Sequence, residues 1–179
     1  MDASRLRRLT PQAVSRTIAL FMPVQVREAQ LEDTPDICRM LLQLGHDGDE
    51  ALVRRRLERV LGTTDHVVLL AQERPHGSVG ILHASTAISL QSPPRVDVHV
   101  LVVTSAHREA GAGRALLERL HNWALRRGID DVATAFARHR KTGHAFFGKL
   151  GYSVAGERRL YKRDLASPLR THEDSTAMD

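Results

Sequence analysis

The pattern of apolar and polar positions predicts a chain in which strands and helices alternate. Residues 24–28 alternate apolar and polar side chains, which is typical of a half-buried strand. Residues 66–72 and 78–89 are strongly apolar and flank a turn at 75–77, so they predict a β-hairpin. Residues 96–103 are rich in valine and predict a further buried strand.

Helical spacing fills the intervals before and after these strands. Thr34 and Pro35 supply a capping residue and a first-turn proline for one helix, and a second helix stops at Gly62. A longer helical pattern runs over 112–127 and ends at Gly128.

The last third of the chain continues the alternation. Residues 131–136 predict a strand and 142–149 a short helix, and 152–154 and 158–165 predict a closing strand pair. The resulting order, β-α-α-β-β-β-α-β-α-β-β, predicts an α/β fold of mixed, α+β-like type around one core.

The chain is expected to form one domain with an additional segment at each end. Residues 1–22 are interpreted as an N-terminal extension, in which Met22 is a candidate native initiator, and residues 23–165 as the domain. Residues 166–179 are polar and are expected to be a disordered tail.

Composition narrows the class of protein. A hydrophobic content of 42% and a charged content of 26% are those of an ordinary soluble protein. The net charge of +5 is compatible with an anionic ligand, whereas 4% aromatic residues argue against single-stranded nucleic acid as a partner. Cys38 is the only cysteine, which excludes an intramolecular disulfide and a cysteine-rich zinc site. No apolar run approaches the ~18 residues of a membrane span, so we expect a cytoplasmic protein with neither membrane nor nucleic-acid partners.

Candidate chemistry follows the valine-rich strand. The turn 108–114 contains Gly111 and Gly113 and leads directly into the helix over 112–127. The first N–H groups of a helix have no intrahelical partner, and the helix dipole adds positive potential there. This arrangement favours binding of an anion, most simply a phosphate.

Two motifs resemble those of a known family. Leu101-Val102-Val103, followed by Arg108-x-x-Gly111-x-Gly113, resembles the cofactor motif of the GNAT superfamily of acetyl-CoA-dependent N-acetyltransferases. The segment Phe146-Phe147-Gly148-Lys149-Leu150-Gly151-Tyr152 is similar to the second signature of that superfamily.

The resemblance extends over about residues 24–165 and implies a central, mostly antiparallel sheet flanked by about four helices. The sheet would be split between the strands around 96–103 and 131–136, and acetyl-CoA would lie in the split. The residues implied to bind this co-substrate are Leu101, Val102, Val103, Arg108, Glu109, Ala110, Gly111, Ala112, Gly113, Arg114 and Phe147. Glu109 stands where the common motif has glycine. No metal is implied.

The implied reaction is transfer of acetyl to a primary amine, which must be neutral to attack. Deprotonating an amine with a pKa of ~10.4 costs about 4 kcal/mol near neutral pH, so a base is useful. His99 and Asp97 lie two residues apart in the predicted strand, on one face, and family members often place a base there. Both could instead simply face solvent or satisfy polar groups of the core. Phe147 occupies the position of the family's usual tyrosine acid, so either Tyr161 protonates the thiolate or the thiolate leaves unassisted.

The sequence says less about the acceptor amine than about the co-substrate. The acidic loop 46–50 would suit a cationic amine, or it is only a solvated loop. We expect a small-molecule amine as the acceptor. The alternatives are acetylation of a protein lysine or N-terminus, and an acyl-CoA-binding module with weak catalysis. The sequence also leaves open whether the protein forms a homodimer.

Overall fold

The computed structural model describes residues 24–46, 48–135 and 141–156. It divides into two compact units, Met1–Arg140 and Lys141–Asp179, each of which is treated by itself below.

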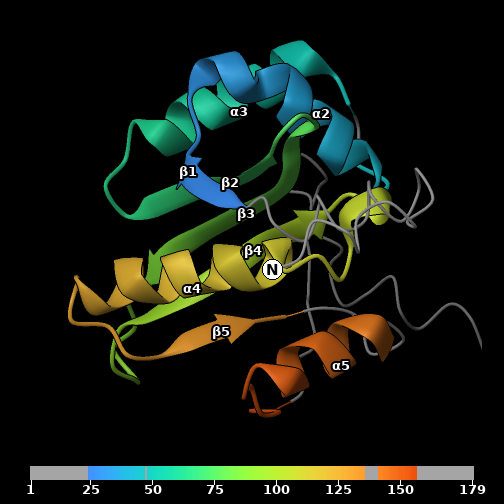
Figure 1. Ribbon diagram of the computed structural model, residues 1–179. Helices are drawn as coiled ribbons and strands as arrows, with labels where there is room; N and C mark the ends of the chain where they lie inside the picture. Colours follow the sequence, from blue (N-terminus) through green and yellow to red (C-terminus); the bar gives the residue numbers. More distant parts are fainter. Residues whose placement is uncertain (1–23, 47, 136–140, 157–179) are drawn as a thin grey trace, which may run out of the picture. The chain divides into compact units, whose positions relative to one another are not determined.

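A five-stranded sheet forms the centre of the described part of the first unit, with the strands in sequence order (Figure 1). Its strands are β1 (Gln25–Glu28), β2 (His66–Glu73), β3 (Gly77–Ala87), β4 (Arg95–Val103) and β5 (Val132–Thr134). The first four strands pair antiparallel, whereas β5 pairs parallel to β4. The fold class is therefore confirmed: the sheet is mixed, mostly antiparallel and flanked by helices.

Helices α2 (Thr34–Leu42) and α3 (Glu50–Leu61) cover one face of this sheet. A short 3-10 helix, η2 (Leu31–Asp33), precedes α2, so the N-cap of α2 is Asp33 rather than the predicted Thr34. The hydroxyl of Thr34 instead donates to the carbonyl of Leu31, because η2 brings that carbonyl within 2.6 Å. The core on this face is built from Ala29, Ile37, Cys38, Met40, Val53, Leu57, Val68, Leu70, Ile81 and Val102.

Helix α4 (Ala112–Leu125) covers the opposite face. Its inward side chains include Leu116, Leu117 and Leu120, none of them more than 1% exposed. The helix packs so closely that a Cβ atom on Gly80 of β3 would lie 3.2 Å from Cδ1 of Leu116. The absence of a side chain at Gly80 therefore permits the packing distance that this face adopts.

The second unit contains α5 (Lys141–Lys149), which confirms the short helix predicted at its position. The strand predicted over 152–154 is wrong, because 152–156 are irregular. The N–H of Tyr152 donates to the carbonyl of Phe147, 3.1 Å away, so this segment completes the end of α5 instead of a ladder. Its predicted partner, 158–165, lies outside the described residues.

None of the helices among the described residues is long and apolar enough to cross a membrane.

Candidate active site

Strands β4 and β5 pair over a short stretch among the described residues. Their parallel pairing covers Val96 to Val98 of β4 and Val132 to Thr134 of β5. The next residue of β4 forms a bulge. His83 of β3 pairs with Val100 and Ala84 pairs with Val98, so His99 between them has no partner in the β3 register and is the extra residue. A bulge bends a strand and increases its twist. The bend thus falls where the recorded pairing with β5 ends, at the position of the predicted split.

Beyond the bulge, no described residue pairs with the edge of β4 that faces away from β3, and we call this the open edge of β4. The N–H of Thr104 donates to the carbonyl of Val79 at 2.9 Å, which fixes which β4 residues bond to β3. Because bonding alternates along an antiparallel strand, the N–H and C=O groups of Leu101 and Val103 point away from β3. The sequence prediction gave these two residues to the pantetheine arm of acetyl-CoA, and the structure places their backbone groups on the side of the split.

A turn joins this edge to α4. The chain passes through the 3-10 helix η3 (Ser105–His107), and then Glu109 and Gly111 adopt positive φ angles of 68° and 90°. The first intrahelical bond of α4 runs from Ala115 N to Gly111 O, so helix geometry leaves the N–H groups of 112–114 without an intrahelical acceptor. These three N–H groups lie at the positive end of the helix dipole.

The side chains of the turn suit close approach of an anion. Ala112 and Gly113 carry at most a methyl group, so no large side chain at these positions stands between a ligand and the N–H groups of the helix start. Arg108 is exposed and its Nε lies 3.5 Å from the carbonyl of Val103. Arg114 is exposed and forms an ion pair with Glu118 at 2.8 Å, one helical turn away.

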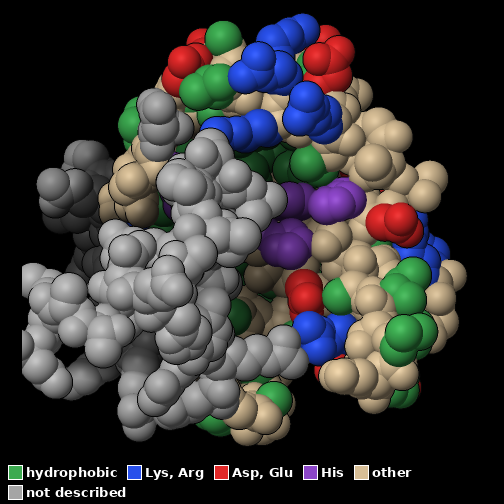
Figure 2. Space-filling view, turned by 180° about the vertical axis from the view of Figure 1, so that it is seen from behind, with side chains coloured by type: hydrophobic (Ala, Val, Ile, Leu, Met, Phe, Trp, Pro, Cys, Tyr) green, Lys and Arg blue, Asp and Glu red, His purple; other side chains and the backbone are tan. Residues whose placement is uncertain are grey.

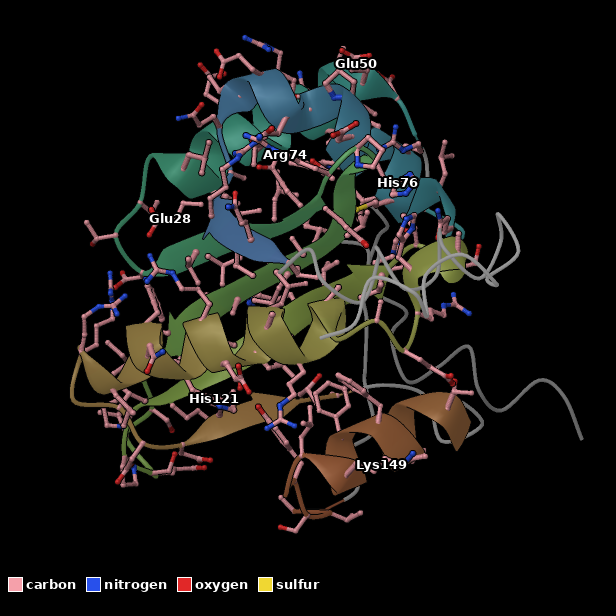
Figure 3. All side chains as sticks on the ribbon, viewed as in Figure 1. Glu28, Glu50, Arg74, His76, His121 and Lys149 are labelled. Carbon is pink, nitrogen blue, oxygen red and sulfur yellow. The ribbon has the colours of Figure 1, made fainter. Side chains whose placement is uncertain are left out.

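The segment before the turn is anchored to the β2–β3 hairpin. Nδ1 of His107 lies 2.9 Å from the hydroxyl of Thr104, and Nε2 of His107 lies 3.9 Å from Oε2 of the buried Glu73. His76, which Figure 3 shows at the hairpin turn, packs its ring 4.9 Å from that of His107. These contacts hold η3 in place at the end of β4.

His99, the predicted base, lies among other polar side chains. Its Nε2 is 2.7 Å from Oγ of Ser85, and its ring centroid is 5.0 Å from that of His83. Figure 2 shows histidine side chains gathered near the centre of one face, between basic and acidic side chains. Burial lowers the pKa of His99, an effect that nearby His66 reinforces and Asp97 opposes. The lower pKa favours the neutral, proton-accepting ring.

Asp97 lies on the same face as His99. Asp97 is directly opposite Ser85 in the register, and directly opposite residues share a face. Both carboxylate oxygens of Asp97 accept hydrogen bonds from Arg95, at 2.7 and 3.2 Å. The structure therefore brings the two predicted catalytic residues of β4 together but gives Asp97 a cationic partner of its own.

Two predicted site residues belong to the second unit, which is described by itself. Tyr161 lies outside the described residues. Phe147 is in the second unit, where its buried ring packs edge-on against those of Phe146 and Tyr152, with centroid distances of 5.3 and 5.1 Å. Burial raises the pKa of Tyr152 to about 12, as expected for a tyrosine in an apolar contact.

Sequence reasoning missed His66, His83 and Ser85 as neighbours of the candidate base. The available signal was weak: each is a polar residue within an otherwise apolar strand, where an unpaired polar side chain is costly.

One residue of the acidic loop before α3, Asp49, is the N-cap of that helix. Oδ1 of Asp49 accepts from the N–H groups of Ala51 and Leu52, at 2.9 and 3.1 Å, and so caps α3. Asp47 lies outside the described residues.

A pocket of about 300 Å³ lies at the start of β2. It is lined by the ends of α3 and α4, by His66 of β2, and by Glu28, which Figure 3 shows at the end of β1. None of the predicted cofactor residues lines it, so it is separate from the β4–β5 split. Among the described residues, no group of three or more His, Cys, Asp or Glu side chains could hold a metal ion.

Comparisons with known proteins identify the family. The family model described as "Acetyltransferase (GNAT) family" matches residues 27–152. No curated protein matches the sequence.

Solved structures share the fold. Aminoglycoside antibiotic 6'-N-acetyltransferase AAC(6')-Ih from Acinetobacter baumannii is 16% identical with a TM-score of 0.72, covering 80% of this chain and 99% of that chain. Glucosamine-6-phosphate N-acetyltransferase from Arabidopsis thaliana is 19% identical with a TM-score of 0.68, covering 79% and 99%. AAC(6')-Iy, solved with the bisubstrate analogue CoA-S-monomethyl-acetylneamine, is 18% identical with a TM-score of 0.70, covering 79% and 99%.

Proposed function

The chain belongs to the acetyltransferase (GNAT) family of acyltransferases, and from this premise we propose that it transfers acetyl from acetyl-CoA to a primary amine of a small molecule. The observation that carries the proposal is the open edge of β4 at Leu101 and Val103, which leads directly into the turn at the start of α4. A backbone edge and an adjacent anion site are what an extended molecule with a pyrophosphate at one end requires.

The residues of this edge fit acetyl-CoA in chemical type. Leu101 and Val103 offer alternating donors and acceptors to the amide groups of a pantetheine arm. The N–H groups of 112–114 offer donors to the pyrophosphate, and the exposed Arg108 and Arg114 add positive charge. The thioester supplies an activated acyl group, so the protein has only to position it and to manage the proton of the amine.

His99 is the proposed base. An amine with a pKa of ~10.4 is protonated near neutral pH, and forming its reactive neutral state costs about 4 kcal/mol of free energy. A base that accepts this proton assists the reaction. The His99 ring is exposed beside the bulge and its lowered pKa keeps it neutral, so it can accept that proton.

Asp97 has a supporting role in this proposal. Its two hydrogen bonds from Arg95 occupy both carboxylate oxygens, so it acts as a fixed charge near His99 rather than as the proton acceptor. Two alternatives stay for the leaving thiolate. Either Tyr161 protonates it, or it departs without assistance.

The proposed acceptor is a small-molecule amine. The support comes from the named activities of structures with this fold, which act on aminoglycosides and on glucosamine 6-phosphate. Acetylation of a protein lysine or N-terminus is the alternative within the same chemistry.

Two measurements test the proposal in sequence. Isothermal titration of the full chain with CoA should give a saturable heat, and a lack of binding would remove the proposal entirely. Incubation with acetyl-CoA and a panel of aminoglycosides, amino sugars, polyamines and lysine peptides should then release thiol for at least one small amine.

A non-catalytic acyl-CoA-binding module is the second candidate. Two observations favour it: Phe147 has no hydroxyl where the family has a tyrosine, and Glu109 places a carboxylate in the turn. CoA binding without thiol release for every amine and peptide would favour this candidate over the enzyme.

A further inference from the structure

Three histidines from three adjacent strands cluster beside the split. His66 comes from β2, His83 from β3 and His99 from β4. The ring centroids of His66 and His83 are 5.3 Å apart, those of His83 and His99 5.0 Å, and those of His66 and His99 6.4 Å. Polar rings this close on one face of a sheet affect one another's protonation.

Two hydrogen bonds order this cluster. Nε2 of His99 lies 2.7 Å from Oγ of Ser85, and Nδ1 of His66 lies 3.0 Å from Nε2 of His83. Each bond engages one ring nitrogen and thereby determines which tautomers of the rings are compatible with it.

We propose that Ser85 is a positioning residue for His99 and holds its ring in the uncharged tautomer with the lone pair on Nδ1, while the rings of His83 and His66 pack beside it. This inference rests on the proposed function, in which His99 is the base.

The Ser85 hydroxyl can donate or accept, and the proposed tautomer is the one in which Nε2–H donates to it. When Nε2–H donates to Oγ of Ser85, the lone pair is on Nδ1 and can accept the amine proton. Nδ1 takes the proton of the protonated amine. The neutral amine nitrogen then bonds to the acetyl carbon while the C–S bond breaks and its electron pair leaves with the thiolate, and the second N–H proton passes to the thiolate or to solvent. His99 becomes an imidazolium that still donates to Ser85. The opposite tautomer would carry hydrogen on Nδ1 and could not accept the proton there.

Burial, more than the surrounding charges, keeps this ring neutral before the amine arrives. The titratable groups that face His99 are Asp97 from β4, paired with Arg95, together with His83 from β3 and His66 from β2. Burial lowers the pKa of His83 to about 4, so at neutral pH it orients His66 without adding charge. His66 disfavours a charge on His99, whereas Asp97 favours it.

The experiment is nitrogen NMR of the histidine side chains in the full chain, without any ligand. We expect wild-type His99 to show hydrogen on Nε2 and a pKa below the ordinary 6.5. His66→Gln should raise that pKa and Asp97→Asn should lower it further, because the two neighbours act in opposite directions. A predominant Nδ1–H tautomer, or shifts of the same sign in both variants, would overturn the inference.

Kinetics provide a second, separate readout. Ser85→Ala should lower kcat about 10–100-fold with little change in the KM for acetyl-CoA, and Ser85→Thr should restore it, since outer hydrogen-bond partners have effects of this size. Ser78→Ala is the matched control and should keep the wild-type kcat, because Ser78 lies in the same strand and its buried hydroxyl has no hydrogen-bond partner among the described residues.

The two levels of the proposal can fail separately. If NMR shows the expected tautomer but His99→Ala keeps full turnover, the proposed base is wrong while the ordering of the ring stands. If His99→Ala abolishes turnover but Ser85→Ala keeps full kcat, the base stands and the role of Ser85 is wrong.

Discussion

Glu109 is the residue at which this chain departs most from what its turn requires. Its φ of 68° is in the region that side chains with a Cβ atom rarely adopt, and no other non-glycine residue among those described has a positive φ. The resemblance pointed to this position because the family has glycine there. The structure supplies the physical reason, since glycine adopts such angles without steric cost.

Glu109→Gly should therefore tighten CoA binding and stabilise the protein. The replacement relieves about 1 kcal/mol of backbone strain and removes a negative charge beside the proposed pyrophosphate site. Titration calorimetry with CoA and urea unfolding measure the two effects. Glu109→Gln is the matched control: it removes the charge but keeps the strained φ, so it should improve binding without stabilising the fold.

His99→Gln should lower kcat/KM about 10²–10⁴-fold, the usual contribution of a general base, with CoA affinity retained. Wild-type kcat/KM should fall at acid pH, because His99 must be neutral to accept a proton. Since its pKa is lowered, that fall should be centred below 6.5. His121→Gln, on α4 (Figure 3), is the control and should keep the wild-type profile. An acid limb above 6.5 would contradict the assignment.

At the level of elements, strand β4 performs two tasks because it changes partners along its length. Its first half pairs with both β3 and β5, and after the bulge at His99 its recorded pairing is with β3 alone. The bulge thus separates the part of β4 that builds the sheet from the part that offers its backbone to a ligand. Helix α4 begins where this open edge ends, which brings the two proposed binding elements together.

Helix α3 begins at a cap whose loss can be measured. Asp49→Ala should lower the free energy of unfolding by about 1 kcal/mol, because two N–H groups of α3 lose their acceptor. Asp49→Asn should keep most of the stability, since asparagine is an equally good N-cap. If the acceptor amine also needs the negative charge of Asp49, Asp49→Asn will raise the KM for the amine while leaving the unfolding free energy nearly unchanged.

For the whole molecule, the Arg27–Asp33 pair connects the edge strand β1 to the entry of α2. The two terminal guanidinium nitrogens of Arg27, Nη1 and Nη2, donate to the carboxylate at 2.7 and 2.6 Å, and Asp33 also accepts from the N–H of Gln30. The hydrogen bonds from Arg27 hold the pKa of Asp33 below its ordinary 3.8.

This pair should contribute to the resistance of the fold to acid. A lowered carboxyl pKa gives stability that is present above pH 3.8 and is lost as pH falls through the native pKa. Wild type should exceed Asp33→Asn by about 1 kcal/mol near neutral pH, because water screens the partly exposed guanidinium, and the difference should shrink below pH 3.8. Urea unfolding of both proteins across this range measures it; a difference that grows toward acid pH would contradict the prediction.

The sequence by itself determined the order of strands and helices over residues 24–149 and the glycine turn before α4. These are local properties: period-two and period-3.6 patterns and turn residues act over a few neighbours. The two motifs that carried the resemblance are local in the same sense, and the family model spanning 27–152 confirms the superfamily.

The tertiary structure alone decided the surroundings of His99. His66 and His83 are 17 residues apart, and the antiparallel register of β2, β3 and β4 brings both rings to His99. The bulge that makes His99 the extra residue has no local signature in a run of alternating valines. Side-chain partners such as Ser85 depend on which residues lie opposite across strands, and pairing register is a property of the assembled sheet rather than of any one segment.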